Sequence, residues 1–174
     1  MKLTKRVRDV RTINTLLTGA EAEARKTGDT LPGAEHLLLS ALALPDGSAR
    51  RTFERVGADP DGLRSAIEGQ HAAALRAIAI EPPDDAELDS DLPAPTRAFR
   101  SNASARSVFE NASKMARSDH SSPLIGAHVV LAIADMEHGT AARALSAMGI
   151  DRTALAAAAR EEIGRRHAPL ATDA

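Results

Sequence analysis

The chain has 174 residues, enough for one well-buried domain or for two small units that share a core. Aromatic residues make up only 2% of the chain, so alanine and leucine must supply most of a hydrophobic fraction of 43%. Both residues favour helices, and the β-branched and aromatic residues that favour strands are scarce. The composition therefore predicts an all-α fold.

Charge and cysteine content exclude several classes of protein. The formal net charge of −2 gives no global attraction to nucleic acid or to an anionic membrane. The chain has no cysteine, which excludes disulfides, thiolate metal sites and cysteine nucleophiles. No apolar run approaches the roughly 20 residues that a membrane-spanning helix needs, and no apolar segment follows the basic N-terminus as in a secretory signal. We expect a cytoplasmic protein that makes no contact with membranes.

Residues 1–9 form a basic segment that we expect to be a solvated arm. The positive charges are Lys2, Lys5, Arg6 and Arg8. The segment lacks the aromatic side chains that stack on bases, so contact with nucleic acid is the less favoured interpretation. A nucleic-acid-associated regulator that uses this arm is accordingly the alternative function.

Residues 10–80 form the first predicted unit, with four helices. The first helix carries apolar residues at helical spacing and ends near Gly28. A short link that contains Pro32 and Gly33 leads into the second helix, which continues through Leu44, where the turn at 45–47 stops it. The third runs from Ser48 to Val56 and ends at Gly57, a left-handed C-cap, and Asp59 is a natural N-cap for the fourth.

A second unit, residues 102–166, repeats this plan at an offset of 92 residues. The segment Gly33-Ala-Glu-His-Leu-Leu-Leu39 aligns with Ile125-Gly-Ala-His-Val-Val-Leu131, and glycines and aspartates further along coincide as well. In the second copy Gly149 closes the third helix and Asp151 caps the fourth. A duplicated helical unit that forms a pseudo-twofold pair explains this pattern.

Between the units, residues 81–101 form an acidic, proline-rich segment. Proline breaks helices and clustered like charge resists packing, so we expect a solvated connector rather than a docking segment for a basic partner. Phe99 follows the acidic run of residues 81–95 and could cover a groove between the units, although a simple packing contact with the second unit is favoured. Residues 167–174 are expected to be a frayed tail.

The helix, the Gly-Ala-Glu-His-Leu-Leu-Leu segment, the Gly-x-Ala and the Val-Gly-x-Asp, repeated at fixed spacing, resemble the amino-terminal repeat domain of the Clp (Hsp100) unfoldases. The resemblance implies a module that binds substrates, adaptors and small ligands, among them phosphoarginine or cyclic peptides. The chain contains no Gly-x-x-x-x-Gly-Lys-[Ser/Thr] phosphate loop, so we do not expect it to act as an unfoldase by itself. The prediction is an adaptor or decoy that binds degradation substrates or components of Clp unfoldases and proteases.

The same resemblance indicates candidate ligand-binding residues. Ala34 and Ala127 stand where the family's repeated segment begins with threonine, and Glu35 matches an acidic position that Ala127 leaves empty in the second copy. Val10 and Asn102 replace a threonine of the first helix in the two copies. Glu35 could pair with a guanidinium group and so preserve one phosphoarginine half-site, or it could be an ordinary acid that favours the helix dipole.

No residue cluster predicts catalysis, a metal or a cofactor. The six histidines show no H-x-x-x-H or H-E-x-x-H spacing, and His36 and His128 are equivalent residues at helix starts, where packing and local hydrogen bonds account for them. Ser121, His120 and Asp119 are sequence neighbours, which does not give the geometry of a catalytic triad. We expect a protein that is not an enzyme and has no metal or cofactor site.

Overall fold

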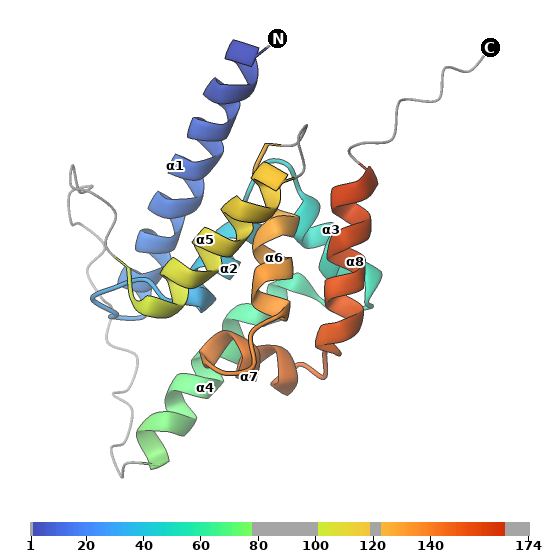
Figure 1. Ribbon diagram of the computed structural model, residues 1–174. Helices are drawn as coiled ribbons and strands as arrows, with labels where there is room; N and C mark the ends of the chain where they lie inside the picture. Colours follow the sequence, from blue (N-terminus) through green and yellow to red (C-terminus); the bar gives the residue numbers. More distant parts are fainter. Residues whose placement is uncertain (1, 78–100, 119–122, 166–174) are drawn as a thin grey trace.

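The protein is helical throughout the part of the chain that the structure describes. Figure 1 shows the computed structural model, which describes residues 2–77, 101–118 and 123–165, with the backbone alone for residues 2–8. The described residues form no strand, which confirms the predicted all-α fold. The elements are α1 (Lys2–Lys26), α2 (Ala34–Leu42), α3 (Ser48–Arg55), the 3-10 helix η1 (Pro60–Gly62), α4 (Leu63–Ala77), α5 (Ala103–Ser118), α6 (Gly126–Ala134), α7 (Thr140–Ala147) and α8 (Arg152–Arg165).

Helices α2 and α6 form the centre of the molecule. They pack against each other, and the remaining helices cover them (Figure 1). Every residue of α6 is buried, and only Leu39 of α2 is not. A helix that is apolar on all sides is stable in water only when other helices surround it, which explains why the two most hydrophobic segments lie in the middle.

The two repeats pack as a pseudo-twofold pair. Helix α1 covers α2 as α5 covers α6, and α3 packs on α8 as α7 packs on α4. The α3–α6 contact likewise corresponds to the α2–α7 contact. Helices of one repeat therefore complete the core of the other, and the two units share a single core.

The pair is not symmetric at the last helix of each repeat. Helix α8 lies along α6 and buries five of its residues, including Leu155, Ala159 and Glu162. Helix α4 has few contacts with α2 and buries only Leu63 and Ile67. In Figure 1 the second half of α4 extends away from the other helices.

The glycines and aspartates that the sequence predicted at helix ends act there in the structure as expected. Gly57 and Gly149 follow α3 and α7 with φ of 70° in both cases, a conformation that glycine adopts without steric cost. Asp59 Oδ1 accepts a hydrogen bond from the Asp61 amide at 2.9 Å, and Asp151 Oδ1 accepts one from the Thr153 amide at 2.8 Å. Helix α2 ends at Leu42, two residues before the predicted end.

The basic N-terminal segment is helical. Residues 2–9, predicted to be a solvated arm, form the first turns of α1 and continue into the first repeat without a break. The expectations for residues 81–100, for Phe99 and for the tail at 167–174 concern residues outside the described part of the chain. None of the described helices has both the length and the hydropathy that crossing a membrane requires.

Candidate functional site

Three of the predicted ligand-binding residues, Ala34, Glu35 and Ala127, lie at the beginnings of α2 and α6, the two central helices. The first amides of a helix have no partner within the helix and must be satisfied from elsewhere. In α2, His36 Nδ1 accepts a hydrogen bond from the Gly33 amide at 2.9 Å, and in α6, His128 Nδ1 accepts one from the Ile125 amide at 3.2 Å. Both histidines are buried, so this equivalent contact explains why both repeats have histidine at this position.

The start of α2 also receives a side chain from the second repeat. The Ala34 amide donates a hydrogen bond to Ser104 Oγ at 3.1 Å, and the Ser104 hydroxyl donates to Asn102 Oδ1 at 2.7 Å. Asn102 in turn caps α5, because its side-chain Oδ1 accepts a hydrogen bond from the Ala105 backbone amide at 3.0 Å. The backbone amide of Asn102 donates to Pro32 O at 3.1 Å. The start of α5 is therefore fixed against the start of α2.

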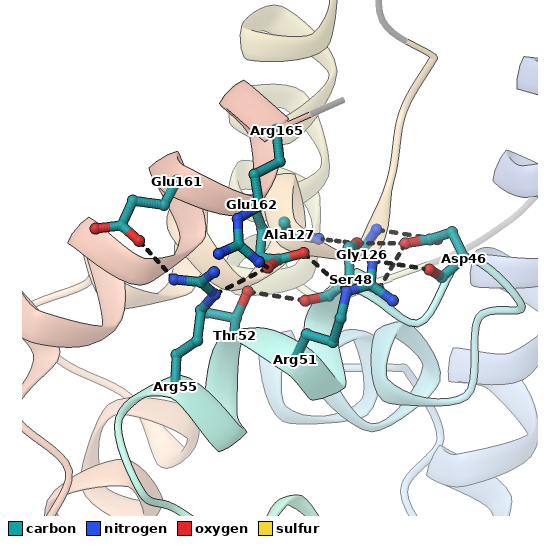
Figure 2. Close-up of polar contacts among 10 residues, drawn as sticks. All are labelled: Asp46, Ser48, Arg51, Thr52, Arg55, Gly126, Ala127, Glu161, Glu162 and Arg165. Carbon is teal, nitrogen blue, oxygen red and sulfur yellow. Dashed lines mark hydrogen bonds and ion pairs between the residues drawn. The ribbon is translucent and has the colours of Figure 1, made fainter. Parts of the chain in front are cut away.

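The start of α6 is occupied by side chains from the first repeat. Figure 2 shows Asp46 and Ser48 beside the first residues of α6. The Gly126 amide donates to Asp46 Oδ2 at 3.3 Å, and the Ala127 amide donates to Ser48 Oγ at 2.9 Å. Asp46 Oδ1 accepts the Ser48 amide at 2.9 Å, which holds the carboxylate in place. An internal carboxylate thus already lies where the helix dipole favours an anion.

Glu35 is a buried carboxylate without a charged or hydrogen-bonding partner among the described residues. The residue is 8% exposed, and its carboxylate folds back over Gly33, where a Cβ atom would lie only 2.1 Å from Glu35 Oε1. The nearest titratable nitrogen is His36 Nδ1, 3.6 Å from Oε1. That nitrogen accepts the Gly33 amide, so it carries no proton to share with Glu35. A buried carboxylate normally has a partner, and this one could accept a cation from outside.

Val10 and Asn102, which the repeat alignment treats as equivalent, lie in different surroundings in the structure. Val10 lies on the outer side of α1, 58% exposed, while Asn102 is next to the start of α2 through Ser104. In return, α1 reaches the second repeat, where the Leu124 amide donates to Asp9 Oδ1 at 3.1 Å. The residues of one copy therefore complete the neighbourhood of the other copy, which an alignment of the copies does not show.

The alanines at the helix starts also need a correction. Helix α2 begins at Ala34 and α6 at Gly126, so the residue equivalent to Ala34 is Gly126. Ala127 is equivalent to Glu35 only, and it is fully buried. The expectation that Ala34 and Ala127 occupy the same position is wrong by one residue.

A network of charges joins α3 to α8 beside this site, and sequence reasoning missed it. Glu162, 4% exposed, accepts hydrogen bonds from Arg51 Nε and Arg55 Nε, both at 2.9 Å, and Arg165 lies 3.5 Å away (Figure 2). Burial of the Glu162 carboxylate acts to raise its pKa, but the hydrogen bonds and positive charges of Arg51 and Arg55 outweigh it and hold the pKa below its usual value. The four-residue spacing of Arg51 and Arg55 was the only signal in the sequence.

Two hollows flank Asp46. The larger, of about 600 Å³, lies between α1, the turn after α2 and the segment before α6. Its lining combines apolar side chains with the charged groups of Arg11 and Asp46; the residues are Arg11, Thr12, Thr15, Leu44, Pro45, Asp46, Pro123, Leu124 and Ile125. The smaller, of about 310 Å³, lies between Asp46, Arg51 and Arg165. The larger one has the size of a small-ligand or peptide pocket.

Thr27, His36 and Asp29 are the residue types of a catalytic triad, but the proton of the histidine ring is on the nitrogen that faces the threonine. Thr27 Oγ1 lies 3.0 Å from His36 Nε2 and donates to Asp29 Oδ2 at 2.8 Å. Because His36 Nδ1 accepts the Gly33 amide, the ring proton is on Nε2. The imidazole therefore donates to Thr27 and cannot take its proton as a general base does. The described residues also contain no group of three or more potential metal ligands.

The fold matches that of a helical domain whose structure is known. It matches the crystal structure of the N-terminal domain of the caseinolytic protease associated chaperone ClpD from Arabidopsis thaliana with a TM-score of 0.58. The match covers 88% of this chain and 92% of that structure at 22% sequence identity. At this identity the match shows a common fold and no more.

The model of the Clp repeat (R) N-terminal domain matches residues 10–93 and 100–170, which is most of the chain. The chain belongs to this family. It is 42% identical over 48 residues to the chloroplastic chaperone protein ClpC of Pisum sativum and 44% identical over 45 residues to the chloroplastic chaperone protein ClpC1 of Arabidopsis thaliana. These segments cover 28% and 26% of this chain and 5% of either relative.

Proposed function

We propose that this chain is a non-catalytic module that binds proteins or peptides in regulated proteolysis, as an adaptor or decoy. Family membership supports this proposal, because the domain is related to the part of Clp unfoldases that recognises substrates and adaptors. The partners would be degradation substrates or components of the Clp machinery. The ClpC chaperones that share the aligned segment are consistent with such partners.

The observation that carries the proposal for a ligand is the buried carboxylate of Glu35 at the start of α2. A guanidinium group can satisfy this carboxylate with two parallel hydrogen bonds, and the partial positive charge of the α2 N-terminus favours an attached phosphate. Phosphoarginine combines both groups in one side chain. We therefore propose that the start of α2, with Ser104 and Asn102 beside it, binds phosphoarginine.

The start of α6 does not support an equivalent second site. Ala127 provides no carboxylate for a guanidinium group, and Asp46 and Ser48 already accept the Gly126 and Ala127 amides. A phosphate at this position would meet the negative charge of Asp46. One phosphoarginine per chain is the expected stoichiometry.

An apolar or cyclic peptide is the second candidate ligand. The larger hollow beside Asp46 supports it, since its volume of about 600 Å³ and its mixed lining suit a peptide. It does not contain Glu35, so the two ligands would not compete for the same carboxylate.

Isothermal titration calorimetry with phosphoarginine tests the proposal, with arginine, which has the guanidinium group but no phosphate, as the more weakly binding control. Saturable binding of one ligand per chain is expected, and Glu35→Gln should weaken it by about 10-fold to 100-fold, because a charge-assisted hydrogen bond contributes about 1.5–3 kcal/mol. Glu54→Gln is the matched control, since Glu54 is an exposed acid on α3. Absence of heat at millimolar phosphoarginine, or equal affinity in both variants, would contradict the phosphoarginine site.

A further inference from the structure

His36 joins the start of α2 to the end of α1 beneath the Glu35 carboxylate. Its Nδ1 accepts the Gly33 amide at 2.9 Å, and its Nε2 lies 3.0 Å from Thr27 Oγ1 and 3.4 Å from Asp29 Oδ2. Glu35 Oε1 is 3.6 Å from the same Nδ1. The side chain is 1% exposed, so the ring cannot turn away from these groups without opening the helix start.

In this arrangement the imidazole is neutral. Nδ1 is an acceptor, and the proton on Nε2 is donated to Thr27 Oγ1. A second proton could bind only at Nδ1, where it would displace the Gly33 amide and face Glu35 Oε1. Protonated His36 would then supply from inside the protein the positive charge that Glu35 otherwise lacks.

We propose that protonated His36 competes with an external guanidinium group for Glu35, so that acidification releases a cationic ligand from the start of α2. This inference rests on the proposed function of Glu35 as a cation-binding residue. It assigns His36 as a positioning residue: the neutral ring fixes Gly33 and leaves the carboxylate free, and the charged ring pairs with the carboxylate.

The charges around His36 determine the pH at which this exchange occurs. Burial lowers the pKa of His36, while the negative charges of Glu35, Asp29 in the loop after α1, and Glu23 on α1 act to raise it. His71 on α4 acts to lower it. The negative charge of Glu23 is itself balanced by Arg64 at 2.6 Å and Lys26 at 2.9 Å. Together these effects hold the pKa of His36 below its ordinary value, so His36 is neutral at neutral pH and leaves Glu35 available in the ligand-free site.

Coupling between the two groups must act in both directions. A guanidinium group on Glu35 cancels the negative charge that favours protonation of His36, so ligand binding must lower the pKa of His36 further. Conversely, each pH unit below the titration of His36 should reduce the affinity by up to about 10-fold, the limit for one competing proton.

The first experiment is calorimetry between pH 7.5 and pH 5.0 with N-acetyl-arginine amide, whose guanidinium charge is constant in this range. The native protein should lose affinity as the pH falls. His36→Asn should bind with nearly constant affinity, because Asn can accept the Gly33 amide through its side-chain oxygen and carries no charge. An equal loss in both proteins would mean that a group other than His36 controls the affinity, and would overturn the role of His36.

The second experiment does not need a ligand and therefore separates this inference from the proposed function. The ring protons of His36 are titrated by NMR in the native protein and in Glu35→Gln. We expect His36 to titrate at a lower pH in Glu35→Gln than in the native protein, because the carboxylate that favours the charged ring is gone. An unchanged titration would overturn the inference even if phosphoarginine binds. A shifted titration in a protein that binds no arginine ligand would support the coupling and contradict only the proposed ligand.

Discussion

At the scale of single residues, Gly126 shows how closely the two repeats approach. A Cβ atom at this position would lie 2.8 Å from Ala49 Cβ and 3.0 Å from Ala41 O, so the start of α6 is in contact with the end of α2 and the start of α3. Two of the three nearest atoms belong to backbone, which cannot move aside as a flexible side chain does. Overpacking of this kind typically costs about 1–3 kcal/mol. We expect Gly126→Ala to lower the free energy of unfolding by this amount, measured by urea denaturation.

Gly69 provides the matched control for that measurement. It lies in the exposed part of α4, and a Cβ atom there would meet nothing within 4 Å. Because alanine is the better helix former, Gly69→Ala should raise the free energy of unfolding by about 0.5–1 kcal/mol. If the two substitutions changed stability in the same direction, close contact at Gly126 would not be the cause.

At the scale of elements, the arginine–glutamate network makes the α3–α8 contact different from its counterpart. The positions equivalent to Arg55 and Glu162 in the α7–α4 contact are Ala147 and Gln70, which carry no charge. Ion pairs therefore join only one of these two related contacts among the described residues, and that contact includes α8, the helix that lies along the central helix α6.

Removal of the Glu162 charge tests this network. Glu162→Gln leaves Arg51 and Arg55 without their shared carboxylate and should reduce the free energy of unfolding by about 1–3 kcal/mol, less than for a fully buried pair because the arginines are partly exposed. Glu161→Gln is the control: Glu161 also pairs with Arg55 but is 64% exposed, so its loss should cost less than about 1 kcal/mol. Equal losses would show that burial of Glu162 is irrelevant.

The pH dependence of stability follows from the same residues. The pKa of Glu162 is lower in the folded protein than in the unfolded chain. The ionised Glu162 therefore stabilises the fold fully above the ordinary carboxyl pKa, and this stabilisation is lost as the pH falls through the pKa of Glu162 in the folded protein. His36 acts at higher pH: its pKa is also lowered, so the unfolded chain takes up the proton first and stability falls as pH drops through the ordinary imidazole range near about 6.5. Thermal unfolding should therefore show two separate losses, and His36→Asn should remove only the upper one.

At the scale of the whole molecule, protection from solvent should follow the layered packing. Helices α2 and α6 are surrounded by others, so their amides should exchange with deuterium only through global unfolding. The part of α4 after Ile67 is not buried and should exchange faster than the equivalent part of α8. Hydrogen–deuterium exchange by mass spectrometry would measure this difference. Equal protection of α4 and α8 would contradict the asymmetry of the two repeats.

The sequence predicted the features that depend on local chemistry. The helical class, the two sets of four helices, the glycine ends at Gly57 and Gly149 and the aspartate caps all follow from residue preferences over short distances. What it could not predict is the contact between copies: Ser104 and Asn102 beside α2, Asp46 beside α6, and Glu162 between two arginines. These contacts join residues 70 or more positions apart, and only the packing of the repeats brings them together.

The exchanged contacts between the repeats show what each half of the chain needs from the other. Asn102, before α5, contacts Pro32 of the first copy, and Asp9 of α1 contacts Leu124 of the second copy. With the offset of 92 residues, Pro32 corresponds to Leu124, and Asn102 corresponds to the residue next to Asp9. Two identical chains related by a twofold axis make this kind of reciprocal contact. Either half of the chain alone would therefore lack contacts that the other half supplies at its helix starts. Because the two halves are parts of one chain, they need not be identical, and one helix start has Glu35 where its counterpart has Ala127.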